Sequence, residues 1–234
     1  MSNLLMLNPG FVVILAGVIC ALLPVGAVRK ALVLAAPAFA AVMIFNAFNA
    51  GGAAQYVISV GPVDLTLMRI DRLAMLWGYV FCLAGVLNAI YGFHEKCRIT
   101  DSSALIYMGA ALSGVFVGDF LSLFIFWEMA AISSVMLVWK GGEYAFPAGV
   151  RYLAIHVLSG VLLLGGAVMF GKANGGDYSI SHVGLDNPGG LLLFLAMGIK
   201  CGFPFLHNWI QDAYPKASIT GTVILSAFTT KLAL

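Results

Sequence analysis

The sequence predicts an all-α, polytopic membrane protein with about eight transmembrane helices, and three observations lead to this fold class. First, 62% of the 234 residues are hydrophobic and only 9% are charged, whereas a soluble domain carries about 25% charged residues. Second, the apolar residues gather in runs that approach the ~20 residues a helix needs to cross a bilayer. Third, the runs lack a period-two alternation, so they predict helices rather than the strands of a barrel.

Eight apolar runs account for the predicted helices. In chain order they are Phe11–Val28, Ala31–Phe48, Leu73–Tyr91, Ser103–Gly118, Phe120–Val138, Tyr152–Phe170, Gly190–Phe205 and Ile219–Leu234. The first run is interpreted as a span rather than a cleaved signal peptide, because its positive residues follow the apolar stretch instead of preceding it. We therefore expect one membrane domain over residues 1–234, with three helices in residues 1–92 and the others in residues 103–234.

The connecting segments predict two exposed structures and an orientation. Gly61–Arg72 is polar at alternate positions and is expected to form a short external hairpin, and residues 171–190, rich in Gly, Asn and Asp, predict exposed turns. Positive residues are more frequent after odd-numbered runs than after even-numbered ones, which places the odd loops in the cytoplasm and the N-terminus outside. The first group is Arg29, Lys30, Lys96, Arg98, Lys140, Arg151 and Lys216, and the second is Arg69, Arg72 and Lys172.

Three charged residues, Glu128, Lys200 and Lys231, lie well inside predicted helices. A lysine or an aspartate at a helix centre costs about 2.5–3.5 kcal/mol on insertion, so residues of this kind are rare without a reason. A lone carboxylate at mid-depth would take up a proton, and Glu128 therefore needs a cation such as Lys200 or Lys231 to stay ionised. The pair is either a fixed lock between two helices or a switch whose separation takes up or releases a proton.

The seventh run contains a break. Pro204 has no N–H, so the carbonyl of Lys200, four residues earlier, loses its helical partner, and the helix is expected to kink or break around the lysine. Gly198 and Gly202 beside it allow close helix approach. Broken helices at membrane depth line polar cavities in transporters. The alternative is a kinked helix whose lysine extends to an interface.

The sequence allows two interpretations for each of His207, His156 and Lys231. His207 either relays protons or caps the bend near the surface, and His156 either relays protons or is a satisfied structural group. Lys231, which follows Thr229 and Thr230, is either a buried functional charge or an interfacial anchor.

Several other kinds of protein and site are excluded. The net charge of +2 and the lack of a basic run interleaved with aromatics give no support for a nucleic-acid partner. The four cysteines form no C-x-x-C pair, so neither a disulfide framework nor a zinc site is expected. Gly166–Lys172 matches G-x-x-x-x-G-K, but Ala173 stands where a phosphate loop needs Ser or Thr. No hydrolase motif is present, so we expect no cofactor, no metal and no enzyme active site.

The charged residues lie in stretches with a family resemblance. These are "FWEMAAISSVMLVW", with Glu128, and "GIKCGFPFLHNWIQDAYPKASITGTVILSAFTTKLAL", with Lys200 and Lys231. They resemble the antiporter-like membrane subunits, which comprise the A-type and D-type subunits of Mrp cation/proton antiporters and the related subunits of respiratory complex I and of membrane-bound hydrogenases. The resemblance spans the whole chain, and "DAYPKASITGTVILSAFTTK" is most similar to the D-type subunit.

The resemblance implies a role for each matching residue. Glu128 matches the helix-five glutamate and Lys200 the lysine of the broken helix seven, which together form a proton-responsive pair. Lys231 matches the helix-eight lysine that links this half-channel to the next one. His207 lies in "PFLHNW", beside the break at Pro204. Family members are longer and contain two inverted repeats, of which residues 103–234 would be most of the first, so the chain is expected to be an N-terminal half: a fragment, a split gene product or a degenerated form.

The function implied by the resemblance is that of one subunit in a multisubunit Na⁺ or K⁺/proton antiporter of the bacterial cytoplasmic membrane. Its partners would be the other subunits, the lipid bilayer, protons and Na⁺ or K⁺. Two alternatives stay open: a redox-driven proton-translocating subunit of complex I or a hydrogenase, and a truncated scaffold that does not transport. Sites built from backbone carbonyls leave no sequence signature, so the cation stays undetermined.

Overall fold

The computed structural model describes residues 7–49 and 55–233, and the elements it contains are helical apart from one hairpin. In chain order they are α1 (Pro9–Leu22), α2 (Ala27–Asn49), β1 (Gln55–Val60), β2 (Val63–Arg69), α3 (Arg72–Tyr91), α4 (Arg98–Phe116), α5 (Phe120–Trp139), α6 (Phe146–Ala173), α7 (Gly190–Cys201), α8 (Asn208–Ala213) and α9 (Ile219–Phe228). Short 3₁₀ turns follow α3, α5, α8 and α9.

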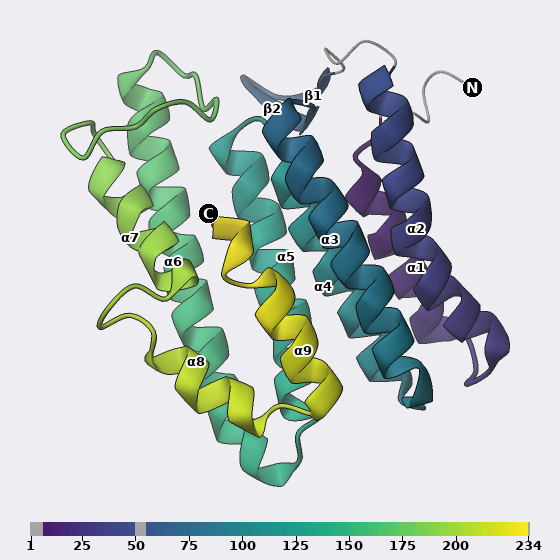
Figure 1. Ribbon diagram of the computed structural model, residues 1–234. Coiled ribbons are helices and arrows are strands. Elements are labelled where there is room, and N and C mark those ends of the chain that lie inside the picture. The colour runs from purple at the N-terminus through teal and green to yellow at the C-terminus, as the bar shows by residue number, and fades with distance from the viewer. Residues whose placement is uncertain (1–6, 50–54, 234) are drawn as a thin grey trace.

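The long helices stand side by side and alternate in direction, which gives the bundle two ends (Figure 1). We call the end that carries β1, β2 and the α6–α7 connection the hairpin end. The opposite end, which carries α8 and the α5–α6 connection, is the α8 end. The α6–α7 layer lies at one side of the bundle, α1 and α2 lie at the other, and α9 crosses in front of α5.

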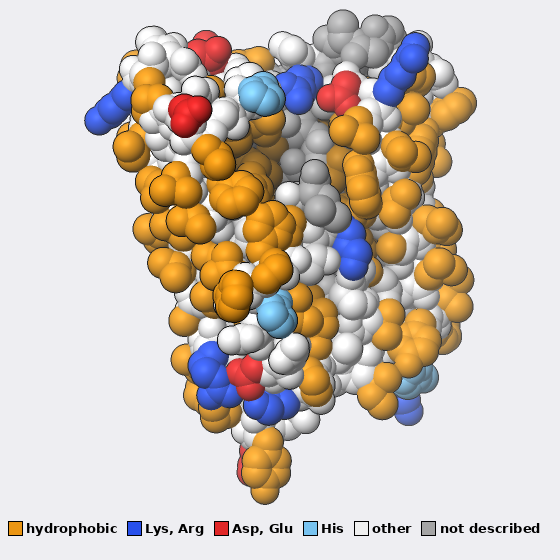
Figure 2. All heavy atoms as spheres, turned by 60° about the vertical axis from the view of Figure 1, so that its left-hand side comes forward, with side chains coloured by type: hydrophobic (Ala, Val, Ile, Leu, Met, Phe, Trp, Pro, Cys, Tyr) orange, Lys and Arg blue, Asp and Glu red, His pale blue; other side chains and the backbone are white. Residues whose placement is uncertain are grey.

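Within the described residues, five helices are long and apolar enough to cross a membrane by length and composition, and three shorter apolar helices accompany them. The long ones are Ala27–Asn49, Arg72–His94, Arg98–Phe116, Phe120–Trp139 and Glu143–Ala173, and the short ones are Pro9–Leu22, Gly190–Cys201 and Ile219–Ala233. Each coincides with one predicted run, so the all-α membrane fold is confirmed. Figure 2 shows apolar side chains over the middle of one face and most charged ones at its two ends, which is the pattern that a lipid environment requires.

The predicted hairpin is present but begins earlier than expected. Gln55–Val60 pairs antiparallel with Val63–Arg69 around a turn at Gly61, whose φ of 63° suits glycine. The N–H of Gly118 donates to the carbonyl of Thr66 at 2.9 Å, and the N–H of Phe120 donates to Tyr178 in the α6–α7 connection. The first bond attaches the hairpin, and the second attaches the α6–α7 connection, to the start of α5.

Arg29 and Lys30 differ from their expected place in a loop. α1 ends at Leu22, just before Pro24, and α2 begins at Ala27, so both residues lie in the first turns of α2 and are buried. Asp101 of α4 accepts from Lys30 Nζ at 3.0 Å and lies 2.9 Å from Arg29 Nε. A buried charge needs a partner, and Asp101 supplies one to both cations at the α8 end.

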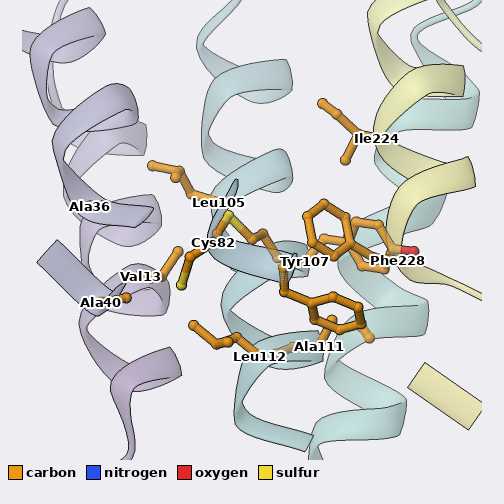
Figure 3. Packing of buried hydrophobic residues seen from close by; sticks show 14 of the residues in the cluster. Val13, Ala36, Ala40, Cys82, Leu105, Tyr107, Ala111, Leu112, Ile224 and Phe228 are labelled. Carbon is orange, nitrogen blue, oxygen red and sulfur yellow. The ribbon is translucent and has the colours of Figure 1, made fainter. Parts of the chain in front are cut away.

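Among the described residues the core is divided into two clusters. The larger one extends from α1 and α2 through α3, α4 and α9 to residues of α5, α6 and α8. In it, Ala36 and Ala40 of α2 face Val13 of α1, and Tyr107 of α4 meets Phe228 of α9 (Figure 3). The smaller one lies between α5, α6 and α7 and includes Trp127. Small residues let the helices approach closely: a Cβ at Gly109 would come within 2.8 Å of the carbonyl oxygen of Gly10. The candidate functional residues lie where the two clusters meet, with Trp127 in the smaller one and Trp209 in the larger one.

Candidate functional site

Glu128 lies in the middle of α5, and the start of that helix is fixed by a carboxylate cap. Asp119 accepts hydrogen bonds from the N–H of Ser122 at 2.7 Å and, across the chain, from the N–H of Thr66 at 2.6 Å. Nine residues further on, at a rise of about 1.5 Å per residue, Glu128 comes about halfway along the helix. Its side chain is half-buried, and its Oε1 is buried without a hydrogen-bond partner.

The carboxylate of Glu128 is seated directly against the backbone of α6. A Cβ built on Gly160 would overlap Glu128 Oε1, because only the missing side chain of this glycine leaves room for the carboxylate. Among the described residues no cation lies within 4.0 Å of Glu128. The glutamate is therefore held in position by shape rather than by a closed ion pair.

Lys200 lies in the last turn of α7, about 2% exposed, and its ammonium group faces Trp127. The Nζ atom is 4.5 Å from the centre of the Trp127 ring and 3.5 Å from the carbonyl oxygen of Trp127. A cation over a tryptophan face is stabilised by the ring quadrupole, most strongly when it is desolvated. Trp127 therefore contacts the ammonium group of Lys200 and directly precedes Glu128 on α5.

A hydrogen-bond chain fixes the orientation of Trp127. Its indole N–H donates to Ser159 Oγ at 3.2 Å, and the Ser159 hydroxyl donates to the carbonyl oxygen of Ala196 at 2.9 Å. Ser159 precedes Gly160 on α6, and Ala196 lies one turn before Lys200 on α7. The three helices that carry the candidate site are thus joined by one buried serine.

The break in α7 follows the prediction, and a glycine completes it. Gly202 adopts a left-handed conformation with φ of 76°, and the N–H of Phe203 returns to the carbonyl of Gly198 at 2.9 Å. The indole N–H of Trp209, in α8, donates to the carbonyl of Ile199 at 2.9 Å. α7 therefore ends one residue after Lys200, and Trp209 satisfies one of its terminal carbonyls.

His156 of α6 is completely buried, and neither ring nitrogen has a hydrogen-bond partner. Its ring lies between Tyr152, at 4.2 Å between ring centres, and Trp209, at 4.4 Å. His156 and Gly160 are one turn apart on α6, so the imidazole lies on the same face as the seat of Glu128. A histidine with two free nitrogens can accept a proton at one and donate one from the other.

The other predicted residues lie apart from this group. His207 precedes α8 and makes no capping hydrogen bond with its side chain, and Pro204 lies exposed in the turn between α7 and α8. Lys231 stands in the 3₁₀ turn after α9, where its Nζ donates to the carbonyl of Ser226 at 2.6 Å. It lines a pocket of about 280 Å³ at the hairpin end. In the part of the chain that the structure describes, no hydrogen bond joins His207 or Lys231 to Glu128 or Lys200.

Four contributing residues could not be singled out from the sequence: Trp127, Ser159, Gly160 and Trp209. Their types are common in apolar helices, and nothing in their spacing distinguishes them from packing residues. The nearest signals are the position of Trp127 beside Glu128 and the presence of Trp209 in the segment "PFLHNW".

An exposed ion-pair group attaches α8 to α6 and predicts a dependence of stability on pH. The carboxylate of Asp212 accepts from Arg151 at 2.7 Å and from Lys216 at 2.5 Å, and hydrogen bonds from these residues, Arg151 first, lower the pKa of Asp212 from 3.8 to about 2. Because the pKa of Asp212 is lower in the folded state than in the unfolded state, its ionised carboxylate stabilises the fold at pH values above the unfolded-state pKa. This stabilisation is lost as the pH falls through the folded-state pKa of about 2.

We expect Asp212→Asn to lower the melting temperature of the purified protein by a constant amount between pH 7 and pH 5. The difference from wild type should shrink as the pH approaches about 2. Circular dichroism melts measure it, with Asp186→Asn, an exposed acid of the α6–α7 connection, as the control. A difference that stays the same at the lowest pH would contradict the prediction.

Comparison with known proteins assigns the chain to a family. A family model described as "NADH:quinone oxidoreductase/Mrp antiporter, TM" matches residues 117–234, which include α5 to α9. A D-type subunit of the Na(+)/H(+) antiporter of Bacillus subtilis (strain 168) is 27% identical over 185 residues, which cover 72% of this chain and 37% of the relative. The NAD(P)H-quinone oxidoreductase chain 4-2 of Synechocystis sp. is 36% identical over 192 residues, which cover 76% of this chain and 32% of the relative.

The fold agrees with this assignment. A chain in the Mrp complex from Dietzia sp. DQ12-45-1b superposes with a TM-score of 0.79 at 20% identity, covering 99% of this chain and 47% of the other. The protein spans about a third of the length of the two curated relatives. With the match over residues 117–234, the chain belongs to the transmembrane family of NADH:quinone oxidoreductase and Mrp antiporter subunits.

Proposed function

We propose that this chain is the N-terminal part of a subunit in a multisubunit monovalent cation/proton antiporter, with Glu128 and Lys200 forming its proton-responsive pair. Residues 103–234 would be most of the first of two inverted repeats, and the other subunits of the complex would be the partners. The location would be the bacterial cytoplasmic membrane with the N-terminus outside, as the distribution of Lys and Arg suggests.

One observation carries the proposal: a buried lysine of α7 lies against the tryptophan that precedes a half-buried glutamate of α5, and the described residues form no closed ion pair between the two charges. Lys200 is held by the ring and carbonyl of Trp127, and Glu128 is held by the space above Gly160. Because neither charge is locked to the other, the two could pair or separate with a movement of the α7 end. A proton taken up by Glu128 would remove its attraction for Lys200. Approach of the Lys200 ammonium group to Glu128 would in turn favour release of that proton.

His156 is the candidate for the next proton-carrying group after the Glu128–Lys200 pair. Its nitrogens are free, and its ring touches Trp209, which in turn holds the end of α7 next to Lys200. His207 and Lys231 retain their proposed roles in the proton path, His207 beside the break and Lys231 as the link toward the rest of the longer protein. Neither sodium nor potassium is favoured by any residue of the chain.

The experiment uses everted membrane vesicles that contain the whole native complex. A proton gradient is established and followed with a pH-sensitive dye, Na⁺ or K⁺ is added, and wild type is compared with Glu128→Gln. We expect the cation to collapse the gradient in wild type and to have no effect in the variant. A full response in a well-assembled Glu128→Gln complex would overturn the role of Glu128.

The second candidate is a redox-driven proton-translocating subunit. It is favoured by the 36% identity to an NAD(P)H-quinone oxidoreductase chain, which exceeds the 27% identity to the Bacillus antiporter relative. The same vesicles separate the two candidates: proton movement that ignores both cations and appears only with an electron donor would assign the chain to the redox-driven branch. Vesicles that show neither response would point to a scaffold that does not transport.

A further inference from the structure

Ser159 lies near the middle of α6 and is completely buried, and its hydroxyl bonds to two other helices. It donates to the carbonyl oxygen of Ala196 on α7 at 2.9 Å and accepts from the indole N–H of Trp127 on α5 at 3.2 Å. A serine inside a helix often bonds back to a carbonyl of its own preceding turn, as Ser133 of α5 does. Ser159 instead uses its donor and one of its acceptor sites between helices.

The position of α6 gives this bridge its importance, because α6 separates the two helices that carry Glu128 and Lys200. α6 packs closely against both α5 and α7, whereas α5 and α7 have little contact of their own. In lipid, small residues and polar bonds between helices set how one helix is rotated and shifted against the next. A bond from α6 to each neighbour therefore helps to fix which side chains of α5 and α7 can meet.

Lys200 of α7 and Trp127 of α5 make a contact of this kind. The ammonium group is 4.5 Å from the ring centre of Trp127 and 3.5 Å from its carbonyl oxygen. In the part of the chain that the structure describes, Nζ of Lys200 makes no salt bridge and no other hydrogen bond. A buried charge requires stabilising partners, so the place of the ammonium group depends on where the ring of Trp127 lies.

Both partners of this contact are tied to the hydroxyl of Ser159. The outer torsion of an aromatic side chain is broad, and the hydrogen bond of the indole N–H selects one rotation of the Trp127 ring. The carbonyl of Ala196 is the helical acceptor for the N–H of Lys200, four residues later. The second bond of the serine therefore holds the turn that carries the lysine, and one oxygen sets the ring and the lysine relative to each other.

We propose that Ser159 is a positioning residue for Lys200, which acts by holding the ring of Trp127 against the ammonium group. The inference rests on the proposed proton-responsive role of Lys200 and adds the group that sets its geometry. The serine carries no proton in this scheme, because its hydroxyl donates to a backbone carbonyl. Without the hydroxyl, the indole could turn away from the lysine, and transport would slow although every charged residue is still present.

The alternative is that Ser159 only joins α5, α6 and α7 as a packing contact. A packing role would change the amount of assembled complex and would act independently of the indole N–H. A positioning role would lower the maximal rate per assembled complex and leave the affinity for the cation unchanged. Its effect would also disappear once the indole N–H is absent, so normalised rates and a double-mutant cycle separate the two roles.

The test measures Ser159→Ala in the vesicle assay with the native complex, normalised to the amount of assembled complex. We expect the maximal transport rate to fall about tenfold and the half-saturating Na⁺ or K⁺ concentration to stay within about twofold of wild type, since a displaced group lowers the rate without altering a separate binding step. Ser133→Ala is the matched control and should leave transport unchanged, because in the described chain this hydroxyl bonds only to carbonyls of its own helix.

Trp127→Phe provides the second arm, because phenylalanine keeps an aromatic ring but has no N–H for Ser159. It should also slow transport, and Ser159→Ala added to Trp127→Phe should slow it no further. A wild-type rate in Ser159→Ala, or effects of the two substitutions that multiply in the double variant, would overturn the inference. If Ser159→Ala does not assemble, wild-type transport by Trp127→Phe would overturn it in the same way.

Lys200→Ala, measured in parallel, distinguishes this inference from the proposed function. Normal transport by Lys200→Ala would mean that the proposed function itself fails. Loss of transport in Lys200→Ala together with a wild-type rate in Ser159→Ala would mean that only the positioning role of the serine fails.

Discussion

Replacing Lys200 by alanine should abolish cation-dependent proton transport while the complex still assembles. The ammonium group of Lys200 lies against Trp127, the residue before Glu128, and no salt bridge to Glu128 is formed by the described residues, so alanine at this position would remove the buried cation proposed to pair with the carboxylate. Loss of a positioned proton-transfer group commonly reduces a rate on the order of 10²-fold or more. The fluorescence recovery of the pH-sensitive dye after a Na⁺ or K⁺ pulse measures this effect.

Assembly should survive because the end of α7 is held by other contacts. Gly202, the return of the Phe203 N–H to Gly198 and the indole of Trp209 on Ile199 do not involve the lysine side chain. Lys216→Ala is a suitable control, because it removes an exposed cation of the α8 end whose one ion-pair partner among the described residues is Asp212. Wild-type transport by a fully assembled Lys200→Ala complex would exclude Lys200 from the proton path.

Replacing Gly160 by alanine should reduce transport nearly as much as the loss of the Lys200 charge. The Cβ of Gly160→Ala would occupy the place of Glu128 Oε1, so the carboxylate must move away from α6. The glutamate side chain is flexible and can shift, hence the fold should persist while the geometry of the Glu128–Lys200 pair changes. We expect transport to fall about tenfold to 10²-fold, since misplacing a reacting group by about 1 Å has effects of this size.

Gly165→Ala provides the matched control five residues further along α6. A Cβ there meets only Leu192 Cδ1, at an ordinary 3.6 Å. Both variants increase helix propensity equally, so the comparison isolates the displacement of Glu128. Equal transport by the two variants, at equal amounts of assembled complex, would show that the seat on Gly160 is not needed.

The hydrophobic pattern by itself determined the membrane fold, the number of apolar helices and the position of the break. Lipid cannot satisfy backbone groups, so every span must be an apolar run of its own, and such a run is readable without knowledge of its neighbours. The break is equally local, because Gly202 and Pro204 act on the backbone within a few residues. The position of Glu128 near the middle of its helix likewise follows from counting residues along its own run.

Only the tertiary structure decided how these residues meet. The seat of Glu128 on Gly160, the ring of Trp127 under Lys200 and the enclosure of His156 by Trp209 depend on how each helix is rotated and shifted against the next. Between helices in lipid this is set by small residues and side-chain packing rather than by a hydrophobic stripe. All faces of these helices are apolar, so the sequence carries no stripe from which the rotation can be read.

Tertiary packing also explains one feature that the sequence analysis placed wrongly, the burial of Arg29 and Lys30, and one that it missed, the contact between Tyr107 and Thr229. Arg29 and Lys30 follow an apolar run, which is the mark of a loop, but Asp101 of α4 draws them into the first turns of α2 as a buried group. Tyr107 and Thr229 are 122 positions apart, and their contact exists only because α9 returns to pack beside α4. Local chemistry thus fixed which segments are apolar enough to enter the membrane, and long-range packing fixed which of their side chains meet.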